Sequence, residues 1–104
     1  MNLQKQPKGK NQKLRDSPKR CPYCMGCGIE NPNGDILCLA HSNRLQDGKG
    51  RGLKARDNTG AILCNNCHNY VDGRSAVATK EEMQNYHYKA HLGTMAWWIK
   101  EGYQ

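Results

Sequence analysis

Residues 61–72 organise this chain, and they read Ala61-Ile62-Leu63-Cys64-Asn65-Asn66-Cys67-His68-Asn69-Tyr70-Val71-Asp72. The Cys-x-x-Cys pair at Cys64 and Cys67 brings two thiolates close enough to share one tetrahedral metal ion. If the chain continues from this pair directly into a helix, His68 and Asp72 lie one turn apart on a common face. The segment therefore predicts a structural metal site and, beside it, a second candidate site.

A second set of cysteines upstream supplies the other half of the metal site. The segment Cys24-Met25-Gly26-Cys27-Gly28 has the form of a zinc knuckle, in which small residues let backbone N–H groups turn toward the sulfurs. Cys21 overlaps this pattern, so Cys21 and Cys24 compete for one ligand position beside Cys27. The predicted structural site is Zn²⁺ held by Cys24, Cys27, Cys64 and Cys67, with Cys21 as the alternative to Cys24.

The setting of the six cysteines favours zinc over disulfides. The N-terminus shows no apolar signal region, and no apolar run is long enough to span a membrane. We therefore expect a cytoplasmic protein without a membrane partner. In a reducing compartment, paired Cys-x-x-Cys spacings indicate zinc ligands, and a disulfide scaffold is the alternative.

Size and charge divide the chain into two parts. At 104 residues, with 37% apolar residues and no Phe, it forms one small domain whose thin core a bound metal would supplement. The net charge of +7 is concentrated in residues 1–20, which hold seven of the 16 Lys and Arg side chains. We predict a disordered basic tail at residues 1–19 and a folded domain at residues 20–104. The tail is either a solvated segment or an arm for a polyanion.

Two short strands are expected to flank a basic loop. Apolar runs bounded by turn residues predict strands at 36–40 and 61–63, with His41 at the end of the first. Cys38 has no partner at metal-ligand spacing and is expected to be a small buried apolar residue. Residues 43–60 are rich in glycine and basic side chains, and they predict an exposed loop.

The C-terminal third is expected to be helical. Thr79 and Glu82 form a capping box, and Gly93 is expected to end or bend the helix that follows. Met95, Trp98 and Ile99 form a second short apolar stripe, and the aromatic side chains of this region are expected to form core or a packing surface. The residues that follow the capping box at helical spacing are Met83, Tyr86, His87 and Ala90.

Together these motifs resemble the HNH endonucleases. The order Cys-x-x-Cys, strand, His, Gly-rich loop, Asn, Cys-x-x-Cys-His is similar to that family's ββα-metal finger, a β-hairpin followed by a helix that clasps a divalent metal. More narrowly, the small prophage-encoded YbcO-like nucleases are similar to the run Leu39-Ala40-His41, Gly50-x-Gly52-x-Lys54-x-x-Asp57-x-x-Gly60-Ala61-x-x-Cys64-x-x-Cys67-His68-x-x-Val71-Asp72-Gly73-Arg74. The resemblance implies an α+β fold, a small zinc-stapled ββα-metal domain with C-terminal helices.

The resemblance implies a role for each matching position. His41 matches the general base that activates water, and Asn58, or Asp57 in its place, matches the middle Asn of the motif. His68 and Asp72 match the ligands of a catalytic divalent cation, Mg²⁺ or Mn²⁺. The chain departs from the family pattern at residue 40, an alanine where many HNH enzymes carry a further ligand. Water and substrate phosphate are therefore expected to complete the coordination.

These roles predict a metal-dependent endonuclease that hydrolyses DNA phosphodiester bonds in phage or prophage DNA processing or recombination, inside a bacterial host cell. A neutral histidine suits water activation at physiological pH. The side chains expected to position the DNA backbone, rather than to read bases, are Arg44, Arg51, Lys54, Arg56 and Arg74. The alternatives are a non-catalytic zinc-ribbon nucleic-acid-binding protein and a protein that binds a protein partner through its C-terminal helices, with Trp97 and Trp98 on that surface.

Overall fold

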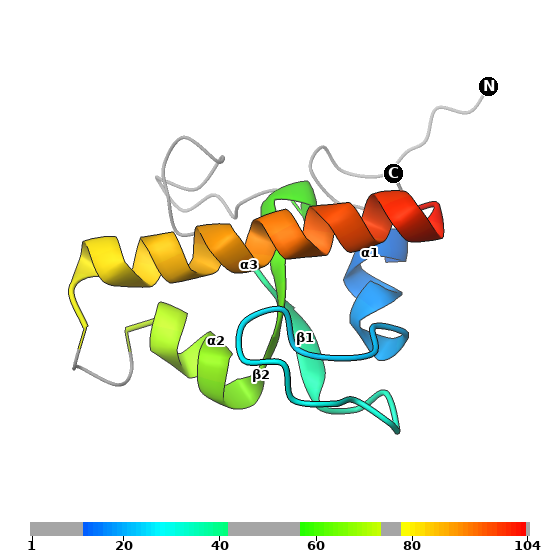
Figure 1. Ribbon diagram of the computed structural model, residues 1–104, viewed down its shortest axis with the longest axis horizontal. Helices are drawn as coiled ribbons and strands as arrows, with labels where there is room; N and C mark the ends of the chain where they lie inside the picture. The colour runs from blue at the N-terminus through cyan, green and yellow to red at the C-terminus, as the bar shows by residue number, and fades with distance from the viewer. Residues whose placement is uncertain (1–11, 42–56, 74–77, 104) are drawn as a thin grey trace.

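The computed structural model describes residues 12–41, 57–73 and 78–103 and shows a mixed α/β domain (Figure 1). A two-stranded sheet lies among three helices and two short 3₁₀ turns in this part of the chain. The predicted mixture of helix and strand is confirmed. In chain order the elements are α1 (Gln12–Asp16), η1 (Ser17–Lys19), β1 (Leu37–Ala40), η3 (Asp57–Thr59), β2 (Ala61–Cys64), α2 (Asn65–Val71) and α3 (Lys80–Glu101).

The sheet is an antiparallel hairpin that leads directly into α2. Leu37 of β1 pairs with Cys64 of β2, and Ala40 pairs with Ala61. Every residue of β2 is buried, which explains its uninterrupted apolar run of small and branched side chains. Helix α2 begins at Asn65, immediately after the strand, and Cys64 is its N-cap residue. The two strands lie within one residue of their predicted positions.

Helix α3 is longer than the sequence predicts. The capping box is present as expected, because the Thr79 hydroxyl accepts from the Glu82 N–H and the Glu82 carboxylate accepts from the Thr79 N–H. The alternative in which Gly93 ends the helix is wrong, since the helix runs through it to Glu101. Gly102, with φ 86°, supplies the left-handed residue that ends the helix, so Gly93 is not needed for that purpose. Neither α3 nor any other described helix is long and apolar enough to cross a membrane.

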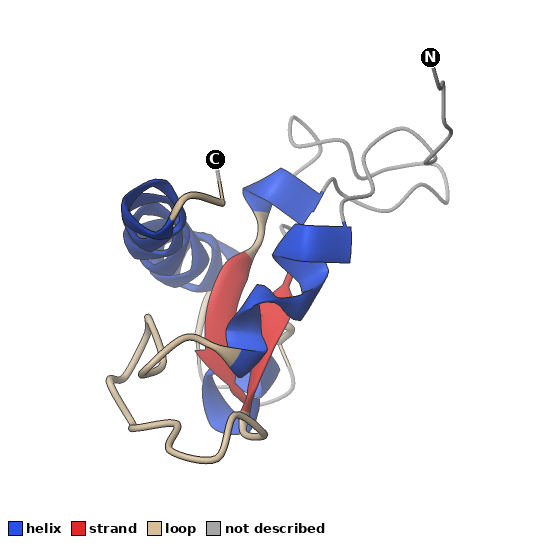
Figure 2. Ribbon diagram, turned by 90° about the vertical axis from the view of Figure 1, so that its right-hand side faces the viewer, coloured by secondary structure: helices blue, strands red, loops and turns tan. Residues whose placement is uncertain are grey.

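Helix α3 holds both strands of the hairpin at the same end (Figures 1 and 2). His87 is buried, and its Nε2 donates to the Ala40 carbonyl over 2.8 Å. One turn later, His91 Nδ1 donates to the Gly60 carbonyl, also over 2.8 Å. Ala40 ends β1 and Gly60 precedes β2. The helix therefore fixes the two points between which the chain leaves and rejoins the sheet.

The N-terminal boundary predicted at residue 19 is wrong for residues 12–19, which belong to the folded body. Leu14 and Ser17 are each only 1% exposed. The Trp98 indole Nε1 donates to the Ser17 hydroxyl over 2.8 Å, and α1 lies beside the C-terminal part of α3 in Figure 1. The sequence does not indicate this packing, because residues 12–19 contain several charged side chains and few apolar ones. Residues 1–11 lie outside the described ranges.

Trp98 is also buried, with 0% exposure. The expectation that Trp98 belongs to a partner-binding surface is therefore wrong. Its ring lies in the core between α3 and the N-terminal turns, where the indole N–H is satisfied by Ser17. Trp97 is half-buried and its ring stacks at a tilt on Tyr103, with 5.3 Å between ring centroids.

Candidate functional site

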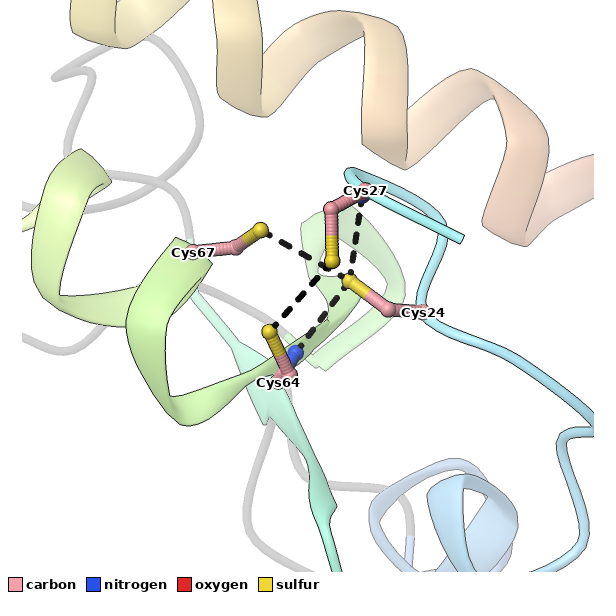
Figure 3. A group of neighbouring side chains, drawn as sticks. All are labelled: Cys24, Cys27, Cys64 and Cys67. Carbon is pink, nitrogen blue, oxygen red and sulfur yellow. Dashed lines mark hydrogen bonds between the residues drawn. The ribbon is translucent and has the colours of Figure 1, made fainter. Parts of the chain in front are cut away.

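Four cysteines converge beside the start of α2 (Figure 3). The sulfurs of Cys24, Cys27, Cys64 and Cys67 all lie within 4.8 Å of one another. Cys24 Sγ is 3.7 Å from Cys67 Sγ, and Cys27 Sγ is 3.7 Å from Cys64 Sγ. A tetrahedral zinc ion with bonds of about 2.3 Å places its sulfurs about 3.8 Å apart. The cluster therefore has the dimensions of a structural zinc site and could hold such an ion.

The knuckle backbone stabilises Cys24 as a thiolate. The N–H groups of Gly26, Cys27 and Cys64 point at Cys24 Sγ, at 3.3, 3.4 and 3.3 Å respectively. Burial raises the pKa of this thiol, but these three backbone hydrogen bonds outweigh burial and lower the pKa to about 7. A thiolate is the form that binds metal. A Cβ at residue 26 would stand 2.8 Å from the Tyr86 hydroxyl, so the small residue in the knuckle is a steric requirement.

Tyr86 of α3 contacts the cluster from the other side. Its hydroxyl lies 3.1 Å from Cys67 Sγ, and its ring packs edge-on against Tyr70 with 4.9 Å between centroids. Burial raises the pKa of the Cys67 thiol, whereas the hydrogen bond with Tyr86 acts in the opposite direction. From the sequence, Tyr86 is predicted to lie on the apolar face of a helix and has no predicted role at the metal. Its contact depends on how α3 packs, which no local pattern encodes.

Cys21 does not join the cluster. It is 1% exposed, and its thiol donates to the Tyr23 carbonyl over 3.2 Å. Among the described His, Cys, Asp and Glu side chains, the one group of three or more whose ligand atoms lie close enough to share a metal consists of the other four cysteines. The spacing alternative that exchanges Cys21 for Cys24 is therefore not supported.

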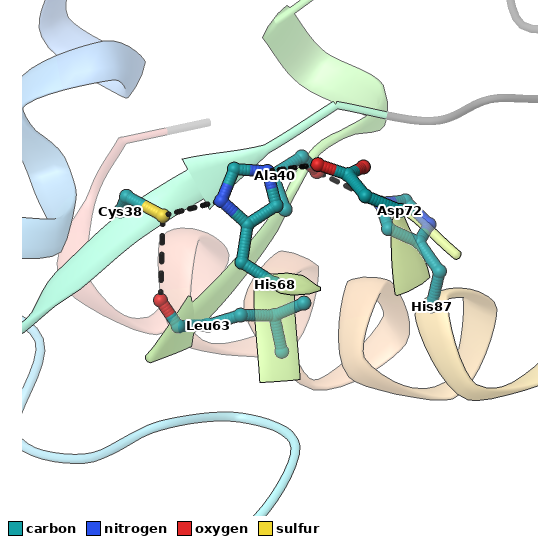
Figure 4. A network of polar contacts seen from close by, with 6 residues as sticks. All are labelled: Cys38, Ala40, Leu63, His68, Asp72 and His87. Atoms are coloured by element: carbon teal, nitrogen blue, oxygen red, sulfur yellow. Dashed lines mark hydrogen bonds and ion pairs between the residues drawn. The ribbon is translucent and has the colours of Figure 1, made fainter. Parts of the chain in front are cut away.

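His68 and Asp72 form a second candidate site at the C-terminal end of α2 (Figure 4). His68 Nε2 lies 3.2 Å from Asp72 Oδ2, and the two side chains are 34% and 27% exposed. The four-residue spacing places both on one face of the helix, as the sequence predicts. An imidazole nitrogen and a carboxylate oxygen at this separation are open to solvent and could serve as two ligands of one divalent cation.

Cys38 extends this site on the side of the hairpin. Its Sγ lies 3.3 Å from His68 Nδ1 and 3.6 Å from the Leu63 carbonyl (Figure 4). Burial raises the pKa of the Cys38 thiol, and the Asp72 carboxylate adds to the rise. The sequence predicts a merely apolar role for Cys38, which its contact with His68 shows to be incomplete. The register of the hairpin could have indicated this contact, because the pairing of Cys38 with Leu63 places Cys38 near the start of α2.

The remaining predicted site residues are only partly covered by the described ranges. His41 directly follows β1 and its side chain is half-buried. Asn58 is exposed in η3, which begins at Asp57. Ala40 is 0% exposed and belongs to the core cluster, so this position packs against the body of the protein. The predicted DNA-contacting residues Arg44, Arg51, Lys54, Arg56 and Arg74 lie outside the ranges that the structure describes.

Comparison with known proteins identifies a solved structure with a similar fold and a matching family. A solved structure described as "Structure of a putative bacteriophage protein from Escherichia coli str. K-12 substr. MG1655" is 22% identical and matches with a TM-score of 0.54. The match covers 88% of this chain and 95% of that one, which shows that the two share a fold. No curated protein matches. The family described as "Putative nuclease YbcO" matches residues 3–103, so this chain belongs to that family.

Proposed function

We propose that this protein is a metal-dependent DNA endonuclease of the HNH type. The observation that carries the proposal is the pair formed by His68 and Asp72, whose ligand atoms lie 3.2 Å apart on a helix that continues directly from a hairpin. The four-cysteine cluster fastens the knuckle to that hairpin and helix, which supports a rigid platform for the pair. The nuclease description of the family supports the same reaction class.

The donor set suits a hard or borderline divalent cation such as Mg²⁺ or Mn²⁺. Two protein ligands leave most coordination positions to water and substrate phosphate, an arrangement that Mg²⁺ commonly adopts. The partial exposure of His68 and Asp72 keeps the site accessible to a DNA backbone. A cation held there supplies neutralising charge for the phosphate and the departing oxygen.

The proposed mechanism assigns the proton transfer to His41. In this mechanism His41 takes a proton from water, and the resulting hydroxide attacks phosphorus in line with the departing 3′-oxygen. The resemblance to HNH enzymes implies products with 5′-phosphate and 3′-hydroxyl ends. Asn58, or Asp57 in its place, orients the site. The zinc at the cysteine cluster is structural and takes no part in bond cleavage.

DNA is expected to bind mainly through its phosphates. The chain carries a net charge of +7, with basic side chains concentrated in residues 1–20 and in the segment between the strands. Contacts to phosphate hold the backbone in register but carry little sequence information. The proposed core is therefore a weakly specific nuclease, whose binding falls steeply as salt is raised.

The test is cleavage of supercoiled plasmid and of a branched DNA in Mg²⁺, Mn²⁺ or EDTA. Wild-type protein is compared with His41→Ala, with His68→Ala and with the control His91→Asn, which keeps a donor near the position of Nδ1. We expect metal-dependent nicking by wild type and control, a loss of at least 100-fold in His41→Ala, and retained zinc in every variant.

Two results would contradict the proposal. Equal nicking activity of wild type and His41→Ala would show that His41 is not the general base. Salt-sensitive DNA binding by a wild-type protein that cuts no substrate in any metal would instead identify a zinc-containing nucleic-acid-binding protein without catalysis.

A further inference from the structure

His68 has a protein partner at each ring nitrogen. Nδ1 lies 3.3 Å from Cys38 Sγ, and Nε2 lies 3.2 Å from Asp72 Oδ2 (Figure 4). A neutral imidazole carries one ring hydrogen, so it donates from one nitrogen and accepts at the other. The two partners therefore determine which nitrogen is available to a cation.

The Asp72 side of the ring is where a cation fits. An ionised carboxylate is an acceptor only, and a histidine that binds metal through Nε2 must present a lone pair there. The ring hydrogen must then lie on Nδ1, which faces Cys38 Sγ. Placing the hydrogen on Nε2 instead would let His68 donate to Asp72 and occupy the position that the cation needs.

Cys38 is placed to accept the hydrogen on Nδ1. Its own thiol hydrogen has a second destination, because the Leu63 carbonyl lies 3.6 Å from the sulfur. Pairing of Cys38 with Leu63 in the hairpin fixes the sulfur relative to the start of α2. The sulfur can thus accept from His68 while its hydrogen points toward the strand.

We propose that Cys38 is a positioning residue that stabilises the Nδ1–H form of His68 and so favours the binding of a divalent cation at Nε2, beside Asp72. This inference rests on the proposed function, because it assumes that the His68 and Asp72 pair binds metal. In many proteins, a partner that hydrogen-bonds to the other ring nitrogen orients a metal-binding histidine. Here the partner is a thiol supplied by the hairpin.

Direct ligation by Cys38 fits the geometry less well. Its sulfur lies at the ring nitrogen opposite to the one that faces Asp72, and one ion cannot bind both nitrogens of a single imidazole. In the described residues, the ligand atoms of these three side chains do not form a common group, unlike those of the four cysteines. The sulfur therefore acts on the cation through His68.

The test uses full-length, zinc-loaded protein and two variants, Cys38→Ala and Cys38→Ser. The control is Cys21→Ala, which removes another buried cysteine whose thiol bonds to a carbonyl. Mn²⁺ affinity is measured by electron paramagnetic resonance, and the ring hydrogen of His68 is located by long-range ¹H–¹⁵N correlation without metal and with the diamagnetic ion Mg²⁺. The metal concentration for half-maximal cleavage is measured alongside.

We expect Cys38→Ala to weaken Mn²⁺ binding about tenfold. At a Mg²⁺ concentration that converts wild type to Nδ1–H, Cys38→Ala should retain more of the Nε2–H signature. The metal concentration for half-maximal cleavage should rise by about the same factor as the loss of Mn²⁺ affinity, with little change in the rate at saturating Mn²⁺. Cys38→Ser should remain within about twofold of wild type, because a hydroxyl both donates and accepts. Cys21→Ala should leave Mn²⁺ affinity and the ring signature unchanged.

The outcomes separate this inference from the proposed function. If Cys38→Ala binds Mn²⁺ like wild type while His68→Ala does not, the role of Cys38 is overturned and the metal site stands. If wild type binds no Mn²⁺ and cuts no DNA, the proposed function fails, and the inference about Cys38 fails with it. If Cys38→Ala does not fold, Cys38→Ser decides, and a tenfold loss in that variant overturns the proposal.

Discussion

Trp98 donates its indole N–H to the Ser17 hydroxyl over 2.8 Å, although 81 positions separate the two residues in the chain. Both side chains are buried, and Ser17 in turn donates to the Leu14 carbonyl over 2.7 Å. The pair joins the first helical turns to the last helix, so both ends of the described chain belong to one folded body.

Because of this contact, substitution of either Ser17 or Trp98 is predicted to lower the stability of the fold. Ser17→Ala leaves the indole N–H buried without a partner and should lower the free energy of unfolding by about 1–2 kcal/mol. Trp98→Ala also removes a fully buried ring and should cost about 3–5 kcal/mol. Urea unfolding in excess zinc measures both.

The matched control is Trp97→Phe, which changes the neighbouring, half-buried tryptophan. It should change stability by less than about 1 kcal/mol. Deleting residues 1–11 should be tolerated, whereas deleting residues 1–19 should destabilise the domain, since it removes the buried Leu14 and Ser17. Equal stability of the two truncated proteins would contradict this assignment of the N-terminal boundary.

The four-cysteine cluster predicts one zinc ion per chain. Cobalt-substituted protein should show the absorption of a tetrahedral four-thiolate site, and strong chelators should unfold the domain because metal binding and folding are coupled. Cys24→Ser and Cys67→Ser should each lose the metal. Cys21→Ser should retain it, and loss of zinc in that variant alone would contradict the ligand set.

The Tyr86 hydroxyl predicts a measurable effect on zinc affinity. Tyr86→Phe removes the hydrogen bond to Cys67 Sγ, which is 3.1 Å long, while it keeps the ring against Tyr70. Loss of such a partner should weaken zinc binding about tenfold in competition with a chelator. Tyr88→Phe, an exposed position on the same helix, is the control and should have no effect.

His87 connects helix α3 to Ala40, the residue that precedes His41. His87→Ala removes the hydrogen bond to the Ala40 carbonyl and should cost about 1–3 kcal/mol, because a buried carbonyl loses its donor. His87→Gln offers a donor at nearly the same distance from the backbone and should recover much of this. Thermal unfolding measures stability, and plasmid nicking tests whether the anchored Ala40 backbone positions His41, in which case nicking should fall in His87→Ala and recover in His87→Gln. Wild-type nicking by folded His87→Ala would contradict this positioning role.

Much of the hairpin and the cysteine cluster was predictable because the signals are local. The Cys-x-x-Cys spacings of Cys24 with Cys27 and of Cys64 with Cys67 prescribe ligand pairs, and a strand between turn residues is recognisable by composition. The same holds for the capping box at Thr79, whose two hydrogen bonds depend on residues three positions apart.

The contacts that were missed all depend on packing between distant segments. Nothing local distinguishes Cys38 from an ordinary buried residue until the hairpin register places it against His68. Tyr86 is likewise a helix-face residue until α3 packs on the knuckle. Gly93 was misread for the opposite reason, since its local helix-breaking tendency is overridden by a helix already capped at both ends.

The hydrogen bonds from His87 to Ala40 and from His91 to Gly60 have a consequence for how the sequence of this fold can diverge. One rigid helix holds both points where the chain leaves and re-enters the sheet, so the separation of these points is independent of what lies between them. Each doubling in length of an intervening segment costs only about 0.6 kcal/mol of closure entropy. Segments of different length and composition could therefore be exchanged at this place, and the nucleic acid preferred by a relative could diverge, without disturbing the cysteine cluster or the His68 and Asp72 pair.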